Sequence, residues 1–191
     1  MLGQALQFLI ETVFGLFSLA LLLRFYLQLV RAPYRNPVSQ FIAALTDWIV
    51  VPVRRVIPGL WGVDLSTLVL AWLAEFLMMI TVLLVKGFAL KSAPGVAVAA
   101  IAVFALVRIF KLSLYIVMVA VIVQAILSWV NPHSPVGPLL NSLTQPFLRP
   151  LRKRIPAVGG VDLSPLVLIV VLQLILMLPV AWLELNVTRL L

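Results

Sequence analysis

The stretch Gly62-Val63-Asp64-Leu65-Ser66 opens an apolar run, and it returns 98 residues later as Gly160-Val161-Asp162-Leu163-Ser164 before a second apolar run. Around this block, Pro37–Leu70 aligns without a gap with Pro135–Leu168, and 16 of the 34 positions are identical. Self-similarity at a fixed period indicates a duplicated structural unit. The sequence therefore predicts two copies of one unit, residues 1–91 and residues 92–191.

The composition places both copies in a membrane. Of the 191 residues, 64% are hydrophobic and 10% are charged, and the mean hydropathy is +1.21. An ordinary soluble domain carries roughly 25% charged residues. Such a domain could not cover this much apolar surface, and a disordered chain needs the opposite composition. Both classes are excluded.

Four apolar runs are long enough to span a bilayer as helices, which takes roughly 20 residues. The runs are Leu6–Val30, Leu65–Val85, Leu112–Val130 and Leu163–Leu183. Two spans in each copy give both copies the same orientation and a pseudo-two-fold axis along the membrane normal. The expected fold is an all-α membrane protein with four transmembrane helices, arranged as two parallel span–amphipathic loop–span repeats.

The segment between the second and third runs is ambiguous. Ser92-Ala93-Pro94-Gly95 is typical of a linker. The following run, Val96–Val107, is short for a span and fits an interfacial or re-entrant piece, or an extension of the third helix. If it were a full span, the number of spans would be odd and the repeats would be inverted.

Each loop between two spans contains an expected amphipathic helix. In the first copy, Asn36 before Pro37 predicts an N-cap followed by proline at the first helical position. In the second copy, Ser134 precedes Pro135, and Pro146 predicts an early end of the helix. These helices are expected to lie in the membrane interface or to pack against the spans, and the two arrangements are compatible.

A basic cluster follows each amphipathic helix. Its members are Arg54 and Arg55 in the first copy and Arg149, Arg152, Lys153 and Arg154 in the second. Cations beside apolar helices determine topology and contact lipid phosphates. We expect these six residues to contact anionic lipid, or to grip a partner protein. Because the net charge of +8 lies next to apolar runs, a membrane surface is the expected partner, and nucleic acid is not.

An acidic residue and a serine open the second span of each copy. The pairs are Asp64 with Ser66 and Asp162 with Ser164. Side chains of these types cap the free N–H groups at the start of a helix. The alternative is an ion pair within each copy, Arg54 with Asp64 and Arg152 with Asp162, and one aspartate could serve both purposes.

Polar residues inside the predicted spans are candidates for function. Glu75 lies within the second span, and the residue at the same position of the repeat, Gln173, lies within the fourth. One interpretation is an interhelical hydrogen bond that orients the bundle. The other is a relay for protons or ions.

Basic residues also predict the orientation in the membrane. The loop side carries Arg31, Arg35, Arg54, Arg55, Arg149, Arg152, Lys153 and Arg154, and the other side carries Lys86, Lys91, Arg108 and Lys111. Eight against four favours repeat loops in the cytoplasm and both termini outside.

Enzymatic chemistry has little support in the sequence. The chain has no cysteine and a single histidine, His133, so disulfides, thiolate-bound metals and a bis-histidine haem within one chain are excluded. It also lacks a phosphate-binding glycine loop, a nucleophile elbow and a carboxylate pair with a histidine. We expect neither an enzyme nor a bound cofactor or metal.

The second copy resembles the signature of the YggT family, whose plastid and cyanobacterial branch is called YlmG. The residues that carry the resemblance are Leu127-Ser128-Trp129, Pro132, Thr144-Gln145-Pro146, Pro150-Leu151-Arg152-Lys153, Ile155-Pro156, Gly159-Gly160 and Asp162-Leu163-Ser164-Pro165. The first copy departs from this motif at Asp47-Trp48, Trp61 and Thr67.

The resemblance implies a small, non-enzymatic, multi-pass protein of the cell inner membrane. It connects such proteins with osmotic tolerance and ion uptake, with division and envelope organisation, and with haem attachment to a b-type cytochrome. The expected function is a scaffold or assembly factor that binds anionic lipid and an unidentified membrane or cytoplasmic protein. The alternative is a small oligomeric ion channel or transport module that uses Glu75 and Gln173, and a homo-oligomer is possible.

Overall fold

A computed structural model describes residues 2–33, 36–57, 59, 63–87, 94–131, 134–155 and 162–189. Its helices are α1 (Leu2–Leu29), α2 (Pro37–Arg54), α3 (Leu65–Val85), α4 (Pro94–Val130), α5 (Gly137–Arg152), α6 (Ser164–Ile175), the π-helical turn η1 (Leu176–Val180) and α7 (Ala181–Thr188). Within the described residues there is no β-strand. Four helical segments are long and apolar enough to cross a membrane, namely α1, α3, α4 and the continuous α6–η1–α7. The predicted all-α fold with four spans is confirmed.

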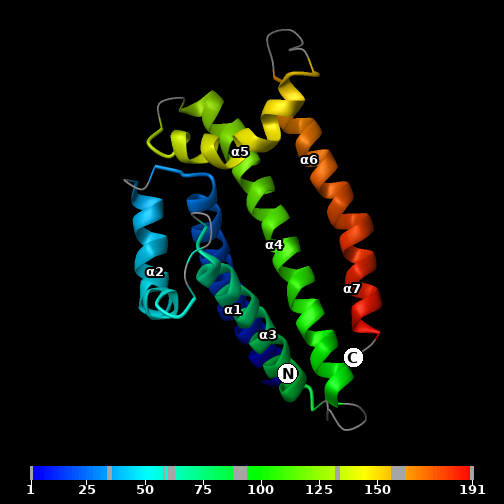
Figure 1. Ribbon diagram of the computed structural model, residues 1–191. Helices are drawn as coiled ribbons and strands as arrows, with labels where there is room; N and C mark the ends of the chain where they lie inside the picture. The colour runs from blue at the N-terminus through cyan, green and yellow to red at the C-terminus, as the bar shows by residue number, and fades with distance from the viewer. Residues whose placement is uncertain are drawn as a thin grey trace.

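The two repeats have the same direction through the bundle (Figure 1). Both first spans, α1 and α4, run upward in this view, and both second spans, α3 and α6–α7, run downward. Below, repeat 1 denotes α1–α3 and repeat 2 denotes α4–α7. The repeats are parallel, as expected from two spans in each copy.

The ambiguous segment Val96–Val107 belongs to the third span. It forms the first part of α4, which is one uninterrupted helix of 37 residues. At 1.5 Å per residue this helix is roughly 55 Å long, well beyond the roughly 30 Å of a hydrocarbon core. The number of spans therefore stays even, and the repeats are not inverted.

Each repeat has an equivalent core beneath its amphipathic helix. In repeat 1 the buried cluster includes Leu21, Val50 and Leu70. In repeat 2 the cluster includes Val121, Leu148 and Leu168. Val50 and Leu70 correspond to Leu148 and Leu168, each 98 positions later. Leu21 corresponds to Val121, 100 positions later, because the first copy has two more residues between the span and the amphipathic helix. The duplication therefore extends to three-dimensional packing.

The two helix hairpins differ in how closely their spans pack. In repeat 1, α1 and α3 contact each other over a longer stretch than any other pair of helices. The small residues Ala71 and Ala74 of α3 are buried in the bundle, and the equivalent positions of α6 hold the larger Ile169 and Leu172. Small residues allow close approach of transmembrane helices. In repeat 2, a groove of about 670 Å³ lies among α4, α5 and α6.

The amphipathic helices begin differently. Asn36 caps α2 as predicted, since its side chain accepts a hydrogen bond from the Ser39 N–H at 2.8 Å and Pro37 is the first helical residue. The prediction for the second copy is wrong, because α5 begins at Gly137. The backbone of Ser134 accepts a hydrogen bond from the Gly137 N–H and donates one to the Asn131 carbonyl, and no described side chain caps the helix.

The predicted early end of the second amphipathic helix is also wrong. Pro146 and Pro150 both lie inside α5, which continues to Arg152. A proline removes one backbone hydrogen bond and disfavours the helix interior. Here Leu143 and Leu148 are buried on either side of Pro146, so tertiary packing outweighs local preference.

Candidate functional site at the loop end of the bundle

Asp64 joins the end of α2 to the start of α3. Its buried carboxylate accepts a hydrogen bond from the Ser66 N–H at 3.1 Å and forms an ion pair with the guanidinium of Arg54. The Ser66 hydroxyl donates to the carbonyl of Ile57 at 2.8 Å. The aspartate is therefore a helix cap and an ion-pair partner at the same time.

Asp162 makes the same two contacts in repeat 2, but in a more exposed setting. It accepts hydrogen bonds from the Ser164 N–H at 2.9 Å and from Arg152 Nε at 2.8 Å, with 40% of its side chain exposed. Partial burial acts to raise the pKa of Asp162. The hydrogen bonds from Ser164 and the Arg152 guanidinium outweigh this effect, so the pKa lies below its ordinary value.

A buried threonine holds each amphipathic helix against the preceding span. In repeat 1, Arg24 Nη1 donates to the Thr46 hydroxyl and to Asp47 Oδ1, both at 2.7 Å. In repeat 2, the Thr144 hydroxyl donates to the side-chain oxygen of Gln124. Both threonines are fully buried and are equivalent in the repeat. The sequence analysis did not predict this role, but Leu45-Thr46 and Leu143-Thr144 are identical in the two copies, and this identity was a signal for it.

The remaining cations of the two basic clusters are exposed. They are Arg55, Arg149, Lys153 and Arg154. Arg55 caps the C-terminus of α2, and Lys153 caps the C-terminus of α5. Cations at these positions interact favourably with the partial negative charge of a helix C-terminus. Of the six predicted residues, the structure places two in ion pairs with aspartate and four at the surface.

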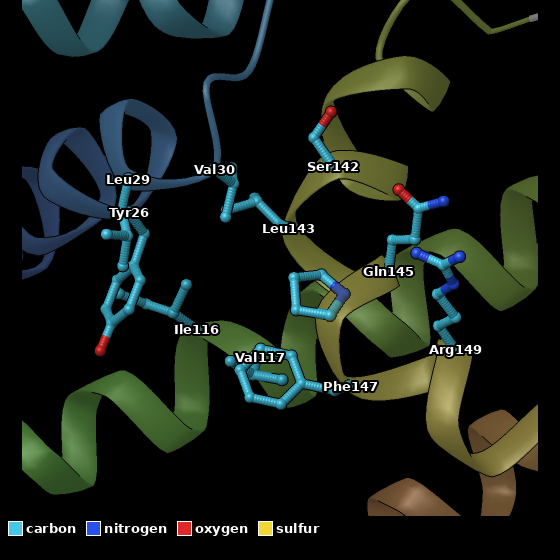
Figure 2. Close-up of a pocket in the computed structure, with 11 residues that line it drawn as sticks. Tyr26, Leu29, Val30, Ile116, Val117, Ser142, Leu143, Gln145, Phe147 and Arg149 are labelled. Atoms are coloured by element: carbon cyan, nitrogen blue, oxygen red, sulfur yellow. The ribbon is translucent and has the colours of Figure 1, made fainter. Parts of the chain in front are cut away.

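A pocket of about 470 Å³ lies between the two repeats beneath α5 (Figure 2). One wall is apolar and contains Tyr26 and Val30 from the end of α1, with Ile116 of α4 below them. The opposite wall, from α5, presents the polar side chains of Gln145 and Arg149. An apolar cavity with a cation at its rim matches the chemistry of a phospholipid, which has an apolar chain and an anionic head group.

Glu75 is the most buried charged residue in the described part of the chain. Only 1% of its surface is exposed, and Oε2 accepts a hydrogen bond from Arg108 Nε of α4 at 3.0 Å. The other oxygen, Oε1, is buried and has no hydrogen-bond partner among the described residues. Gln173 is exposed on α6, and no hydrogen bond joins it to Glu75. Although they are equivalent in sequence, these two residues have different environments.

A second ion pair links α4 to the end of the last span. Lys111 Nζ contacts both carboxylate oxygens of Glu184 in α7, at 2.9 and 2.8 Å. Arg108 and Lys111, which the count of basic residues assigned to the side opposite the repeat loops, both lie within α4, and each pairs with a glutamate.

Metal coordination has no candidate in the described part of the chain, where no group of three or more histidine, cysteine, aspartate or glutamate side chains comes together. His133, Trp61 and the glycines at 159–160 lie outside the described residues.

These features define an α-helical, multi-pass membrane protein with a duplicated hairpin, in which an aspartate–arginine contact joins the amphipathic helix to the second span of each repeat. The family model described as CCB3/YggT matches residues 3–85 and 103–183, one segment in each repeat. The chain belongs to this family, as the motif indicated.

Several curated relatives support the assignment. The chain is 39% identical over 179 residues to an uncharacterized protein of Pseudomonas aeruginosa, covering 93% of this chain and 89% of the relative. It is 35% identical over 173 residues to the uncharacterized protein YggT of Escherichia coli, covering 90% and 87%. A protein of Vibrio alginolyticus, described by its place in the proC 3′ region, is 36% identical over 172 residues, covering 89% and 90%. No solved structure matches the chain.

Proposed function

We propose that this protein is a non-enzymatic scaffold or assembly factor of the inner membrane, whose loop end binds anionic lipid and a partner protein. The observation that carries the proposal is that the six basic residues fall into two groups, two that pair with aspartates and four that do not within the described part of the chain. Arg54 and Arg152 hold the two loops through Asp64 and Asp162. The other four cations of the clusters are exposed, Arg55 at the C-terminus of α2 and Arg149, Lys153 and Arg154 at or next to the C-terminus of α5.

Exposed cations beside an apolar bundle attract an anionic membrane surface, at about 1 kcal/mol each. The pocket beside Arg149 offers a place for an acyl chain against Tyr26 and Val30. The same excess of basic residues supports a cytoplasmic location for the loops. A partner protein with an acidic surface would find Lys153 and Arg154 at the tip of α5.

Two charge-neutralising pairs of substitutions test the proposal. The variant Lys153→Gln/Arg154→Gln removes two exposed cations at the loop end, and the control Lys86→Gln/Arg189→Gln removes two exposed cations at helix ends elsewhere in the chain. Neither pair contains a residue of the aspartate–arginine contacts. Both variants should insert normally, because the changed side chains are not packed in the bundle.

The measurement is affinity purification from native membranes in a mild detergent, with identification of bound proteins and of retained phospholipid. We expect a stoichiometric partner and anionic lipid with the unchanged protein and the control, and a marked loss of both with Lys153→Gln/Arg154→Gln. Equal recovery from both variants, or recovery of further copies of this chain alone, would contradict the proposal.

Glu75 supports a second candidate, a transport module. A buried carboxylate with one oxygen lacking a partner could accept a proton or an ion. Its pairing with Arg108 argues against this, since the arginine already compensates the charge. Proton and cation flux into vesicles that contain the protein would decide the matter. If Glu75 carries ions, Glu75→Gln should abolish a flux that the parent protein shows, and a parent protein without flux removes this candidate.

A further inference from the structure

The amphipathic helix of repeat 2 covers the end of the first span of repeat 1. Leu139 and Leu143 of α5 pack with Leu27 of α1, and all three are less than 10% exposed, at 4%, 6% and 7%. Val30 contributes to the same cluster, and Figure 2 shows it beside Leu143. This contact adds to the interface between the repeats, in which α4 packs more extensively against α3 and α1.

The equivalent face of α2 in repeat 1 is uncovered. Phe41 and Leu45 lie 98 residues before Leu139 and Leu143, but they are 65% and 45% exposed. Trp48, on the next turn of the same face, is 68% exposed. Phe41 and Leu45 are therefore exposed where their repeat equivalents are buried against protein, whereas Trp48 and its equivalent Pro146 are both exposed. We call Phe41 and Leu45 the α2 stripe.

The surface that would complement the α2 stripe is also uncovered. The positions equivalent to Tyr26, Leu27 and Val30 lie 100 residues later at the end of α4. Leu127 is half-buried, and Ile126 and Val130 are 53% and 77% exposed. We call Ile126 and Val130 the α4 end. Between the described residues of α2 and α4, no Cα–Cα distance is 8 Å or less.

The docking of the repeats is thus one-sided, which differs from the closed two-fold arrangement expected from the sequence. A closed two-fold would place α2 on α4 in the same way that α5 lies on α1. In the structure α5 contacts α1, but α2 does not contact α4. An interface of this head-to-tail kind leaves one unsatisfied surface at each end, and further copies can continue it.

We infer that the α2 stripe of one copy packs against the α4 end of a second copy, and that this contact repeats the internal one between α5 and α1. Both surfaces are apolar, and both have a covered counterpart in the same chain. Lipid alone would account for an exposed apolar helix face, but not for a pair of surfaces whose repeat equivalents bind each other. The inference does not depend on the proposed lipid and partner binding.

The absence of cysteine from the sequence makes the contact testable by thiol cross-linking. Leu45→Cys and Val130→Cys are made in separate chains, and the two chains are produced together in one membrane and treated with a short bifunctional maleimide. We expect a dimer from the mixture, several-fold more abundant than from either variant alone, because a head-to-tail contact brings unlike residues together.

Matched controls are available in the same chain. Val30→Cys/Leu143→Cys, the internal equivalent of the tested pair, should cross-link within one chain. Leu16→Cys, on an exposed face of α1 (62% exposed), should not cross-link to Val130→Cys above the level of random collision. A chain that carries both Leu45→Cys and Val130→Cys should give larger oligomers, or one closed ring of fixed size.

Three results would overturn the inference. The first is a mixed dimer no more abundant than the Leu16→Cys control. The second is a stronger dimer from Leu45→Cys alone, which indicates a symmetric contact. The third is a cross-link that forms only within the doubly substituted chain, which indicates that α2 closes onto α4 of its own copy. Loss of lipid or partner binding in the basic-cluster variant bears on the proposed function and leaves this result unchanged.

Discussion

Repeat 1 and repeat 2 contain the same internal contacts in different surroundings. In both repeats an aspartate accepts a hydrogen bond from the serine N–H at the start of the second span and pairs with an arginine, and a buried threonine holds the amphipathic helix to the first span. The surroundings differ because α1 and α3 pack closely, whereas a groove lies among α4, α5 and α6. The contacts within each repeat are made by residues that both repeats share. The packing of neighbouring helices differs because the residues at those positions differ between the repeats.

The same comparison explains why equivalent polar positions have unlike environments. Glu75 is enclosed by α3 and α4 and has an arginine partner from the other repeat. Gln173, at the equivalent place, is exposed on the outer side of α6. Only repeat 1 therefore has its second-span polar residue at the interface between the repeats.

The largest expected effect is the loss of the cation beside Glu75. Arg108→Leu leaves a buried carboxylate without its partner, a change that typically costs about 3–5 kcal/mol. The free energy of unfolding, measured by detergent titration in mixed micelles, should fall by that order. Gln173→Leu, at the exposed equivalent of Glu75, should change it by no more than about 0.5 kcal/mol.

The double variant Glu75→Leu/Arg108→Leu is the control for this prediction. It removes both charges, so most of the stability should return, because a buried ion pair is often replaceable by apolar side chains. A double variant as unstable as Arg108→Leu would show that the arginine acts through other contacts, such as its approach to the sulfur of Met78 at 3.9 Å.

A smaller effect is expected when the close packing of repeat 1 is disturbed. Ala74→Leu introduces at a buried position of α3 the residue that repeat 2 has at Leu172. Overpacking of a close helix contact typically costs about 1–3 kcal/mol. The control variant Ala99→Leu, at an exposed position of α4, should have little effect on the free energy of unfolding. Equal free energies of unfolding for the two variants would show that side-chain volume does not determine how closely the spans of each hairpin pack.

The smallest difference concerns the two capping aspartates. Asp64→Asn keeps a capping side chain but removes a buried charge-assisted contact, which should cost about 1–2 kcal/mol. Asp162→Asn removes a contact that is 40% exposed and should cost less than about 1 kcal/mol. A larger loss for Asp162→Asn than for Asp64→Asn would contradict the difference in burial between the two sites.

A pH titration sharpens this last comparison. Because the folded-state pKa of Asp162 lies below its ordinary value of 3.8, its contribution to stability is present above that value and is lost as the pH falls through the lowered pKa. The carboxyl carbon shift of Asp162, followed by NMR in micelles, should therefore have its midpoint below 3.8. A midpoint at or above 3.8 would show that the contacts with Ser164 and Arg152 do not persist in solution.

Sequence patterns predicted the elements of this fold because those elements depend on local composition. Apolar runs of about 20 residues predicted the spans, and the repeat predicted their parallel arrangement. The Asn36 cap was also predictable, since a cap is a contact between residues three positions apart. The start of α5 and the continuation of α5 through Pro146 were predicted wrongly, because contacts with α1 and α4 stabilise a helix that is locally unfavourable.

The sequence by itself determined the class of protein, the duplication and the family, because hydropathy, identity and motif spacing are properties of the chain. Only the tertiary structure decided which charges meet. Arg108 pairs with Glu75 and Lys111 with Glu184 across 33 and 73 residues of chain, and the rotation of each helix about its axis selects those partners. It also decided that Leu45 is exposed while Leu143 is buried, since burial depends on what lies opposite a side chain, and the two repeats have different neighbours.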